Sequence, residues 1–90
     1  MATKNIVQAS TTPGGGAVQV LAANAGRLST LIRVWGENPV FLGKDNTVTT
    51  QTGFPLHPAD GLLADAISAA DALWAISNGQ GDIRVMEFLT

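Results

Sequence analysis

The clearest alternation of apolar and polar positions along the chain lies in residues 28–36. Because successive side chains of a strand point to opposite faces, this stretch predicts a strand with two sets of residues. The first set is Leu28, Thr30, Ile32 and Val34, and the second is Ser29, Leu31, Arg33 and Trp35. Leu31 and Trp35 would form an exposed apolar pair on a solvated sheet. We therefore expect the second face to be covered, by another sheet or by a second subunit.

Residues 82–89 repeat this two-sided pattern. Ile83, Val85 and Leu89 share one face, and Arg84, Met86 and Phe88 share the other. A weaker alternation over residues 17–22 predicts another strand, with Val18, Val20 and Ala22 on one side and Gln19 on the other. Burying a large apolar side chain contributes about 1.5–3 kcal/mol. Four such residues on second faces therefore predict the interface of a homo-oligomer, namely Leu31, Trp35, Met86 and Phe88.

Two short apolar runs, each closed by Gly or Pro, occupy the middle of the chain. They are Pro39-Val40-Phe41-Leu42-Gly43 and Thr52-Gly53-Phe54-Pro55-Leu56. These breakers are costly inside a long helix or a central strand, so both runs predict short strands. Between the runs, residues 43–46 are turn formers, and residues 47–50 have the β-branched composition of a strand. The segment predicts a hairpin or a bulged meander.

The order and spacing of several segments resembles a pattern found in small structural proteins of tailed bacteriophages. The resemblance covers about residues 27–87 and is carried by Val40-Phe41-Leu42-Gly43, Thr49-Thr50, Thr52-Gly53-Phe54-Pro55-Leu56, Leu73-Trp74-Ala75-Ile76-Ser77 and Asp82-Ile83-Arg84-Val85-Met86-Glu87. It implies a β-sandwich or jelly-roll-like module on the virion, as a capsid decoration, head-fibre or tail-accessory subunit assembled in the host cytoplasm. The implied partner is the major capsid protein or another virion protein. Threefold positions recur on such particles, so we expect the oligomer to be a trimer.

Residues 62–76 fit two structures. Apolar residues at helical spacing, with Asp60 as a possible N-cap, favour a helix of about four turns. The resemblance instead implies strands at residues 62–67 and 72–77, joined by a turn at residues 68–71. We favour the strands, because Asn78-Gly79-Gln80-Gly81 is a hairpin-like turn and the alternating strand after it needs a partner.

Turn signals at residues 24–26, 36–39, 57–61 and 78–81 complete the prediction of an all-β fold with six to eight short strands. Residues 1–16 are polar and end in Pro13-Gly14-Gly15-Gly16. They predict an N-terminal arm and a flexible hinge, which leaves residues 17–90 as a single β domain. The arm is either a frayed terminus or an anchor, in which Asn5, Ile6, Val7 and Gln8 add as an edge strand to a neighbour or to a capsid surface.

The charge of the chain disfavours nucleic acid as a partner. The formal net charge is −2, and the five Lys and Arg residues are scattered along a chain of which only 13% is charged. No apolar run approaches the roughly 18 residues of a membrane span, and the N-terminus lacks the apolar segment of a signal peptide. Hydrophobic residues make up 46% of the chain, which is more than one small core needs. Self-association would bury the excess.

No arrangement of residues indicates catalysis or a cofactor. The chain has no cysteine, and its one histidine, His57, has no serine in a Gly-x-Ser-x-Gly elbow to activate. One histidine beside Asp60 is too little for a transition metal, and Lys44-Asp45-Asn46-Thr47 lacks the spacing of a calcium loop. We therefore expect a structural protein without enzymatic activity. The alternative is a carbohydrate-binding, host-adsorption module in which Trp35 or Trp74 stacks on a sugar.

Overall fold

The computed structural model describes residues 5–11, 14–64 and 71–89. Within these ranges the chain forms eight strands and one short 3₁₀ turn, η1 (Pro58–Asp60). The strands are β1 (Asn5–Thr11), β2 (Val18–Leu21), β3 (Arg27–Val34), β4 (Val40–Gly43), β5 (Phe54–Leu56), β6 (Leu62–Ala64), β7 (Leu73–Ile76) and β8 (Ile83–Leu89). The prediction of a β-rich fold with almost no helix is confirmed.

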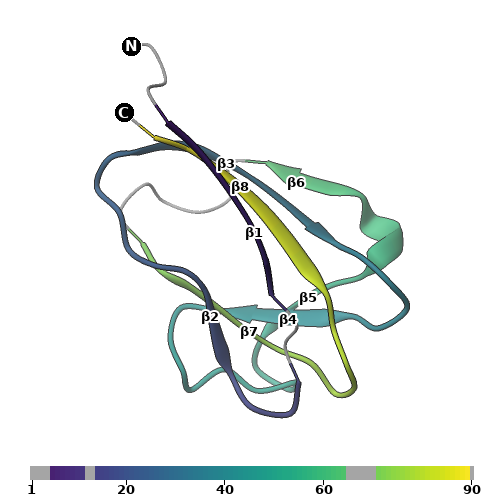
Figure 1. The fold of residues 1–90 in the computed structure, drawn as a ribbon. Helices are drawn as coiled ribbons and strands as arrows, with labels where there is room; N and C mark the ends of the chain where they lie inside the picture. The colour runs from purple at the N-terminus through teal and green to yellow at the C-terminus, as the bar shows by residue number, and fades with distance from the viewer. Residues whose placement is uncertain (1–4, 12–13, 65–70, 90) are drawn as a thin grey trace.

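The strands form two antiparallel sheets of four strands each (Figure 1). One sheet has the order β1-β8-β3-β6, and the other has the order β2-β7-β4-β5. Each sheet therefore joins strands from both halves of the chain, and strands that follow one another in sequence mostly belong to different sheets. Among the described strands, only β4 and β5 are sequence neighbours that also pair with each other.

The apolar core receives side chains from both sheets. Ile32, Val34, Ile83 and Val85 come from one sheet, and all four are almost completely buried. From the other sheet, the described residues of this core cluster are Val20, Leu21, Val40, Leu42, Leu56, Leu73 and Ala75. In β4 and β7, and in β3 from Thr30 onward, buried positions alternate with exposed or half-buried ones, as expected for a strand with one face on a core.

Two β-bulges change the predicted faces. Thr30, Ile32 and Val34 of β3 point into the core as predicted, but Leu28 is 42% exposed. The pairing of β3 with β8 shifts register between Arg27 and Ser29, so Leu28 leaves the alternation and Arg27 is buried in its place. A similar shift between Gln19 and Leu21 in β2 buries Leu21. Two predictions are therefore wrong: Leu28 does not share a face with Thr30, Ile32 and Val34, and Ala22, which is exposed and lies beyond β2, does not share a side with Val20.

The central hairpin is confirmed, with Val40 opposite Leu56 and Leu42 opposite Phe54. The strand predicted at residues 47–50 is wrong, because these residues lie in the loop between β4 and β5. Val48 of this loop is only 8% exposed. A Cβ atom built on Gly43 would lie 2.4 Å from the Cβ of Val48, and one on Gly53 would lie 2.9 Å from its Cγ2. The loop therefore folds back so that Val48 fills the space that the two glycines leave.

Residues 62–76 do not form the alternative helix, since Leu62–Ala64 is β6 and Leu73–Ile76 is β7. Asp60 is accordingly no N-cap for such a helix, and its carboxylate accepts a hydrogen bond from the backbone N–H of His57. The turn expected at residues 68–71 lies mostly outside the described residues. The strands were predicted correctly at residues 62–64 and 73–76, and residues 65–67 of the first predicted strand lie outside the described residues. The hairpin argument that supported them was wrong. β7 and β8 do not form a hairpin, because residues 77–82 carry the chain from one sheet to the other.

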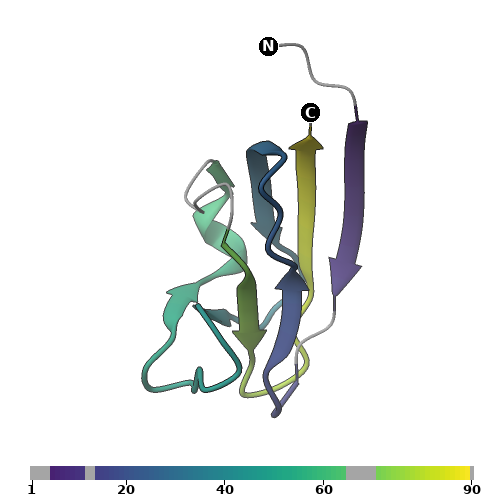
Figure 2. The same ribbon diagram turned by 90° about the vertical axis from the view of Figure 1, so that its left-hand side faces the viewer.

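The N-terminal segment contains a strand of the chain's own sheet. Residues 5–11, which the sequence assigns to an arm, form β1 and pair with β8 from Asn5 opposite Leu89 to Thr11 opposite Ile83. Figure 2 shows β1 at the edge of its sheet, beside β8. The other edge of β1 has no partner strand among the described residues. Addition of this segment to a neighbouring protein stays a prediction.

Candidate interaction surface

The four residues predicted to form an interface come from one side of the sheet β1-β8-β3-β6. Leu31 of β3 lies directly opposite Met86 of β8, and Phe88 lies opposite Ser29. These positions alternate with the core residues, so they belong to the outer face. Leu31, Met86 and Phe88 are half-buried, and Trp35, just beyond β3, is 52% exposed. The structure therefore places all four residues on one surface.

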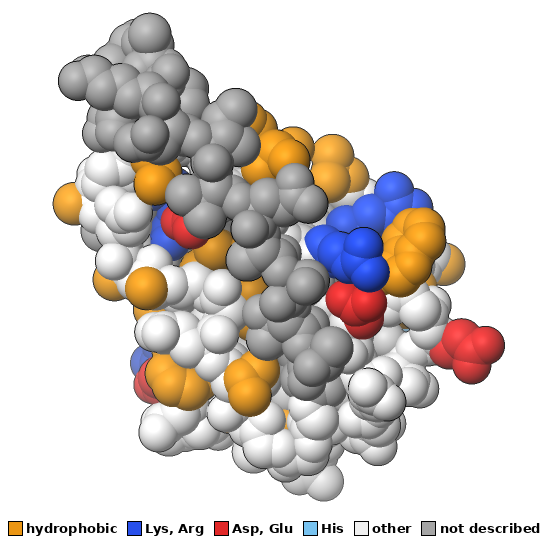
Figure 3. Space-filling view, in the orientation of Figure 1, with side chains coloured by type: hydrophobic (Ala, Val, Ile, Leu, Met, Phe, Trp, Pro, Cys, Tyr) orange, Lys and Arg blue, Asp and Glu red, His pale blue; other side chains and the backbone are white. Residues whose placement is uncertain are grey.

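A fifth apolar residue joins this surface and was not predicted from the sequence. Leu62 of β6 lies opposite Arg33 of β3 and is 60% exposed. The alternation over residues 62–64 is too short to reveal which side faces outward. We call the five residues the outer patch: Leu31, Trp35, Leu62, Met86 and Phe88. Hydrophobic and basic side chains lie side by side at the right of Figure 3.

Two arginine side chains hold the indole of Trp35. The guanidinium carbon of Arg33 is 5.2 Å from the centre of the ring, and that of Arg84 is 5.9 Å from it. Cation–π contacts at exposed sites contribute about 0.5–1 kcal/mol each. Arg84 also binds the carboxylate of Asp82, with a nitrogen–oxygen distance of 3.2 Å. The backbone carbonyl of Asp82 accepts a hydrogen bond of 2.8 Å from the backbone N–H of Trp35. The ring is thus positioned although half of its surface meets water.

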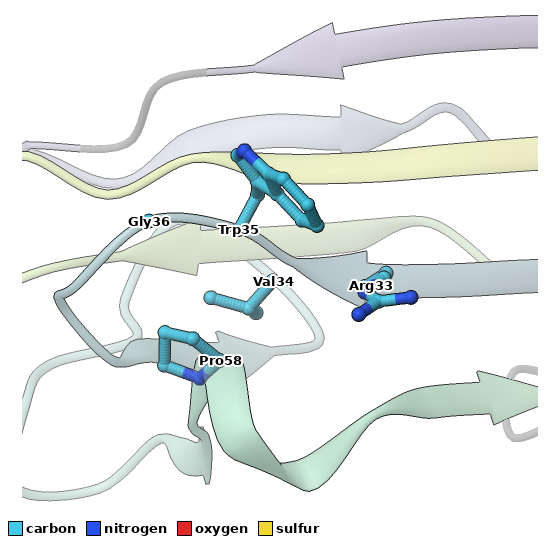
Figure 4. Close-up of a pocket in the computed structure, with 5 residues that line it drawn as sticks. All are labelled: Arg33, Val34, Trp35, Gly36 and Pro58. Carbon is cyan, nitrogen blue, oxygen red and sulfur yellow. The ribbon is translucent and has the colours of Figure 1, made fainter.

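A cleft of about 380 Å³ lies beside Trp35 (Figure 4). β6 pairs with β3 only at Leu31, Ile32 and Arg33, so Val34 and Trp35, which line the cleft, lie beyond this pairing. In Figure 4 the end of β3 runs between the indole of Trp35 and the ring of Pro58. The residues that line the cleft are Arg33, Val34, Trp35, Gly36 and Pro58. They offer one cation and a mostly apolar wall.

His57 and Asp45, which the sequence analysis considered as candidate ligands, interact with residues close to them in sequence. The Nδ1 atom of His57 is 3.5 Å from the carboxylate of Asp60, and both side chains are about half exposed. Asp45 accepts hydrogen bonds from the hydroxyl and the backbone N–H of Thr47, and these bonds lower the pKa of its carboxyl group. Within the described ranges, no three His, Asp or Glu side chains lie close enough together to hold a metal ion. No helix in the described part of the chain is long and apolar enough to cross a membrane.

The outer face of the second sheet also carries apolar side chains, of which the sequence analysis singled out only Trp74, as a candidate for sugar stacking. Phe41 of β4 lies between Ile76 of β7 and Pro55 of β5, and Trp74 lies opposite Gly43. The available signal was that β4 and β7 are unbroken apolar runs, which are typical of strands covered on both faces. Trp35 and Trp74 therefore belong to different sheets. They do not form a common platform for a sugar.

Comparisons with protein-family models, with curated proteins and with solved structures found no match for this chain. The resemblance to structural proteins of tailed phages therefore stays a prediction.

Proposed function

We propose that the protein is a non-enzymatic structural subunit of a tailed-phage particle, with a β-sandwich fold. In this proposal it is a capsid decoration or head-fibre subunit that self-associates through the outer patch and binds the major capsid protein or another virion protein. The observation that carries the proposal is the outer patch, where five large apolar side chains of one sheet face remain partly in water. The resemblance adds the setting of a phage particle.

The energetics favour assembly through this patch. Full burial of a large apolar side chain contributes about 1.5–3 kcal/mol, and the half-buried members of the patch have only part of that left to gain. Trp35 and Leu62 have the most to gain, because they are 52% and 60% exposed. Association itself costs at least about 4 kcal/mol in lost freedom of motion. One patch gives weak pairing, whereas a closed trimer gains three interfaces at once, and many copies on a particle add avidity.

Sedimentation equilibrium at micromolar protein tests the assembly. We expect a mass near three times 9.3 kDa, and we expect Trp35→Asp to dissociate the oligomer because it puts a charge into the patch. Phe54→Asp is the matched control, since Phe54 is a 65% exposed aromatic on the other sheet. A monodisperse monomer for the unchanged chain, or equal dissociation by both variants, would contradict assembly through the outer patch.

The particle assignment has its own test. Purified protein should add to mature, expanded capsids that lack it, and mass spectrometry should find it in purified virions. Absence from virions would reject the structural role in a phage even if the protein is a trimer in solution.

Carbohydrate binding is the second candidate, and the cleft beside the half-exposed Trp35 is the observation in its favour. Against it, two guanidinium groups already lie near the ring, where a sugar would have to stack. A glycan array is expected to show no specific binding. Specific binding that Trp35→Ala abolishes would replace the structural proposal.

A further inference from the structure

Beside the outer patch lies a cation, Arg33, that has no acidic partner in the described part of the chain. Of the arginines, Arg27 binds Glu87 and Arg84 binds Asp82. Arg33 is exposed, and no carboxylate of the described residues lies within 4.0 Å of its nitrogen atoms. Its guanidinium group lies over the ring of Trp35. Arg33 therefore keeps free hydrogen-bond donors at the mouth of the cleft that it helps to line.

An acidic residue without a cationic partner follows Trp35 closely. Glu37 is exposed in the connection between β3 and β4, and no Lys or Arg of the described chain lies within 4.0 Å of its carboxylate. Gly36, between Trp35 and Glu37, has a φ angle of +88° and turns the chain there. Arg33 and Glu37 do not bind each other within one chain, although only Trp35 and its two neighbours separate them.

We propose that Arg33 of one copy pairs with Glu37 of the next copy in the oligomer, with the carboxylate at the mouth of the cleft beside Trp35. The inference rests on the proposed assembly and names its polar contacts. In a closed ring each copy contributes Arg33 to the interface with one neighbour and Glu37 to the interface with the other. Every interface therefore contains the same ion pair. The arrangement places a central tryptophan inside a charged rim, which is the usual anatomy of a strong contact site. The ion pair also fixes how the outer patches of two neighbouring copies are oriented relative to each other.

Charge reversal tests the pairing directly. Arg33→Glu and Glu37→Arg each replace an attraction by a repulsion at every interface, and we expect each to weaken association roughly tenfold or more at low salt. The double variant Arg33→Glu/Glu37→Arg restores opposite charges across each interface and keeps the net charge at −2. We expect it to regain association to within about threefold of the unchanged chain.

Two controls separate this contact from net charge. Lys44→Glu changes the charge of the chain as much as Arg33→Glu does, but Lys44 lies in the loop between β4 and β5 and not at the outer patch. The double variant Lys44→Glu/Glu37→Arg has the net charge of the unchanged chain without the exchanged pair. It is expected to stay as weak as Glu37→Arg. Circular dichroism of each variant confirms that the exposed substitutions leave the fold intact.

Each result has a definite meaning. Restoration by the exchanged pair alone supports the contact. An oligomer that neither single reversal weakens, or that the exchanged pair does not restore, rejects the Arg33–Glu37 contact and leaves the proposed assembly standing. If Lys44→Glu/Glu37→Arg restores association equally well, the Arg33–Glu37 contact is also rejected, because net charge then explains the effect. A monomeric unchanged chain rejects the proposed assembly itself, and the pairing with it.

Discussion

Arg27 is expected to be the most sensitive charged residue of the fold. Its side chain is 1% exposed, and its Nε donates a hydrogen bond of 2.8 Å to the carboxylate of Glu87, which is itself 14% exposed. Its two terminal nitrogens donate to the backbone carbonyls of Asp71 and Ala22, at 2.8 and 2.7 Å. Those carbonyls flank β7 and β2, which belong to the other sheet. The guanidinium group thus ties the two sheets together.

Replacing Arg27 by Met removes these donors and leaves the carboxylate of Glu87 nearly buried without its cation. Removing one partner of a buried ion pair typically costs about 3–5 kcal/mol. A domain of this size loses roughly 4–8 °C of melting temperature per kcal/mol, so we expect a fall of roughly 12–40 °C. Since the whole free energy of unfolding of a domain is about 5–15 kcal/mol, the variant should be close to unfolded at 37 °C.

Urea and thermal unfolding followed by circular dichroism measure this effect. Lys44→Met is the control, because it removes an exposed cation, and it should change the free energy of unfolding by less than about 0.5 kcal/mol. The double variant Arg27→Met/Glu87→Met should be more stable than Arg27→Met alone, since no unpaired charge remains. A loss below about 1 kcal/mol for Arg27→Met would refute the reasoning.

Three further predictions concern the loops. Gly43→Ala should destabilise the fold by about 1–3 kcal/mol in urea unfolding, because the new Cβ meets Val48 at 2.4 Å. Adding Val48→Ala should recover part of the lost stability, whereas an unchanged unfolding midpoint for Gly43→Ala would show that the loop moves aside freely. Gly36→Ala should cost about 1 kcal/mol, since φ is +88° there although the surrounding space is open, and Gly15→Ala is its control, because the space around Gly15 is also open and its φ is outside the left-handed region. The Asp45 carboxyl should titrate below 3.8 by NMR, because its pKa is lowered by the hydrogen bonds from Thr47. Its contribution to stability is therefore present above the pKa of the unfolded chain and is lost as the pH falls through the pKa of the folded protein. A titration midpoint at or above 3.8 in the folded protein would contradict these hydrogen bonds.

The strands were predictable where alternation or paired breakers marked them. β3, β8 and the β4–β5 hairpin follow from patterns of residue type, and these patterns also placed Leu31, Met86 and Phe88 on an outer face. The bulge at Arg27 was not predictable, because a bulge adds one residue to a strand without a fixed sequence signal at that place. In the sequence Arg27 is one of five scattered Lys and Arg residues, and no pattern marks it as the one that the fold buries.

Pairing between strands was harder to predict than the strands themselves. The turn signal at residues 78–81 is the same for a hairpin and for a connection between two sheets, so it could not show that β7 and β8 lie in different sheets. The cleft beside Trp35 brings the end of β3 together with Pro58 of η1, which is a tertiary property. Similarly, Val48 looked like part of a strand because β-branched residues suit strands, yet two glycines allowed the loop to fold over and bury it.

The position of β8 has a consequence for the order in which the protein can fold. β8 is the last of the described strands, and it lies between β1, the first, and β3. During synthesis, β1 has no strand to pair with in its own sheet until residues 83–89 have left the ribosome. Because almost every pairing joins distant parts of the chain, folding should be slow, and incomplete chains should expose unpaired edges. A nascent chain stalled before Ile83 should therefore remain protease-sensitive, whereas one released after Leu89 should become resistant.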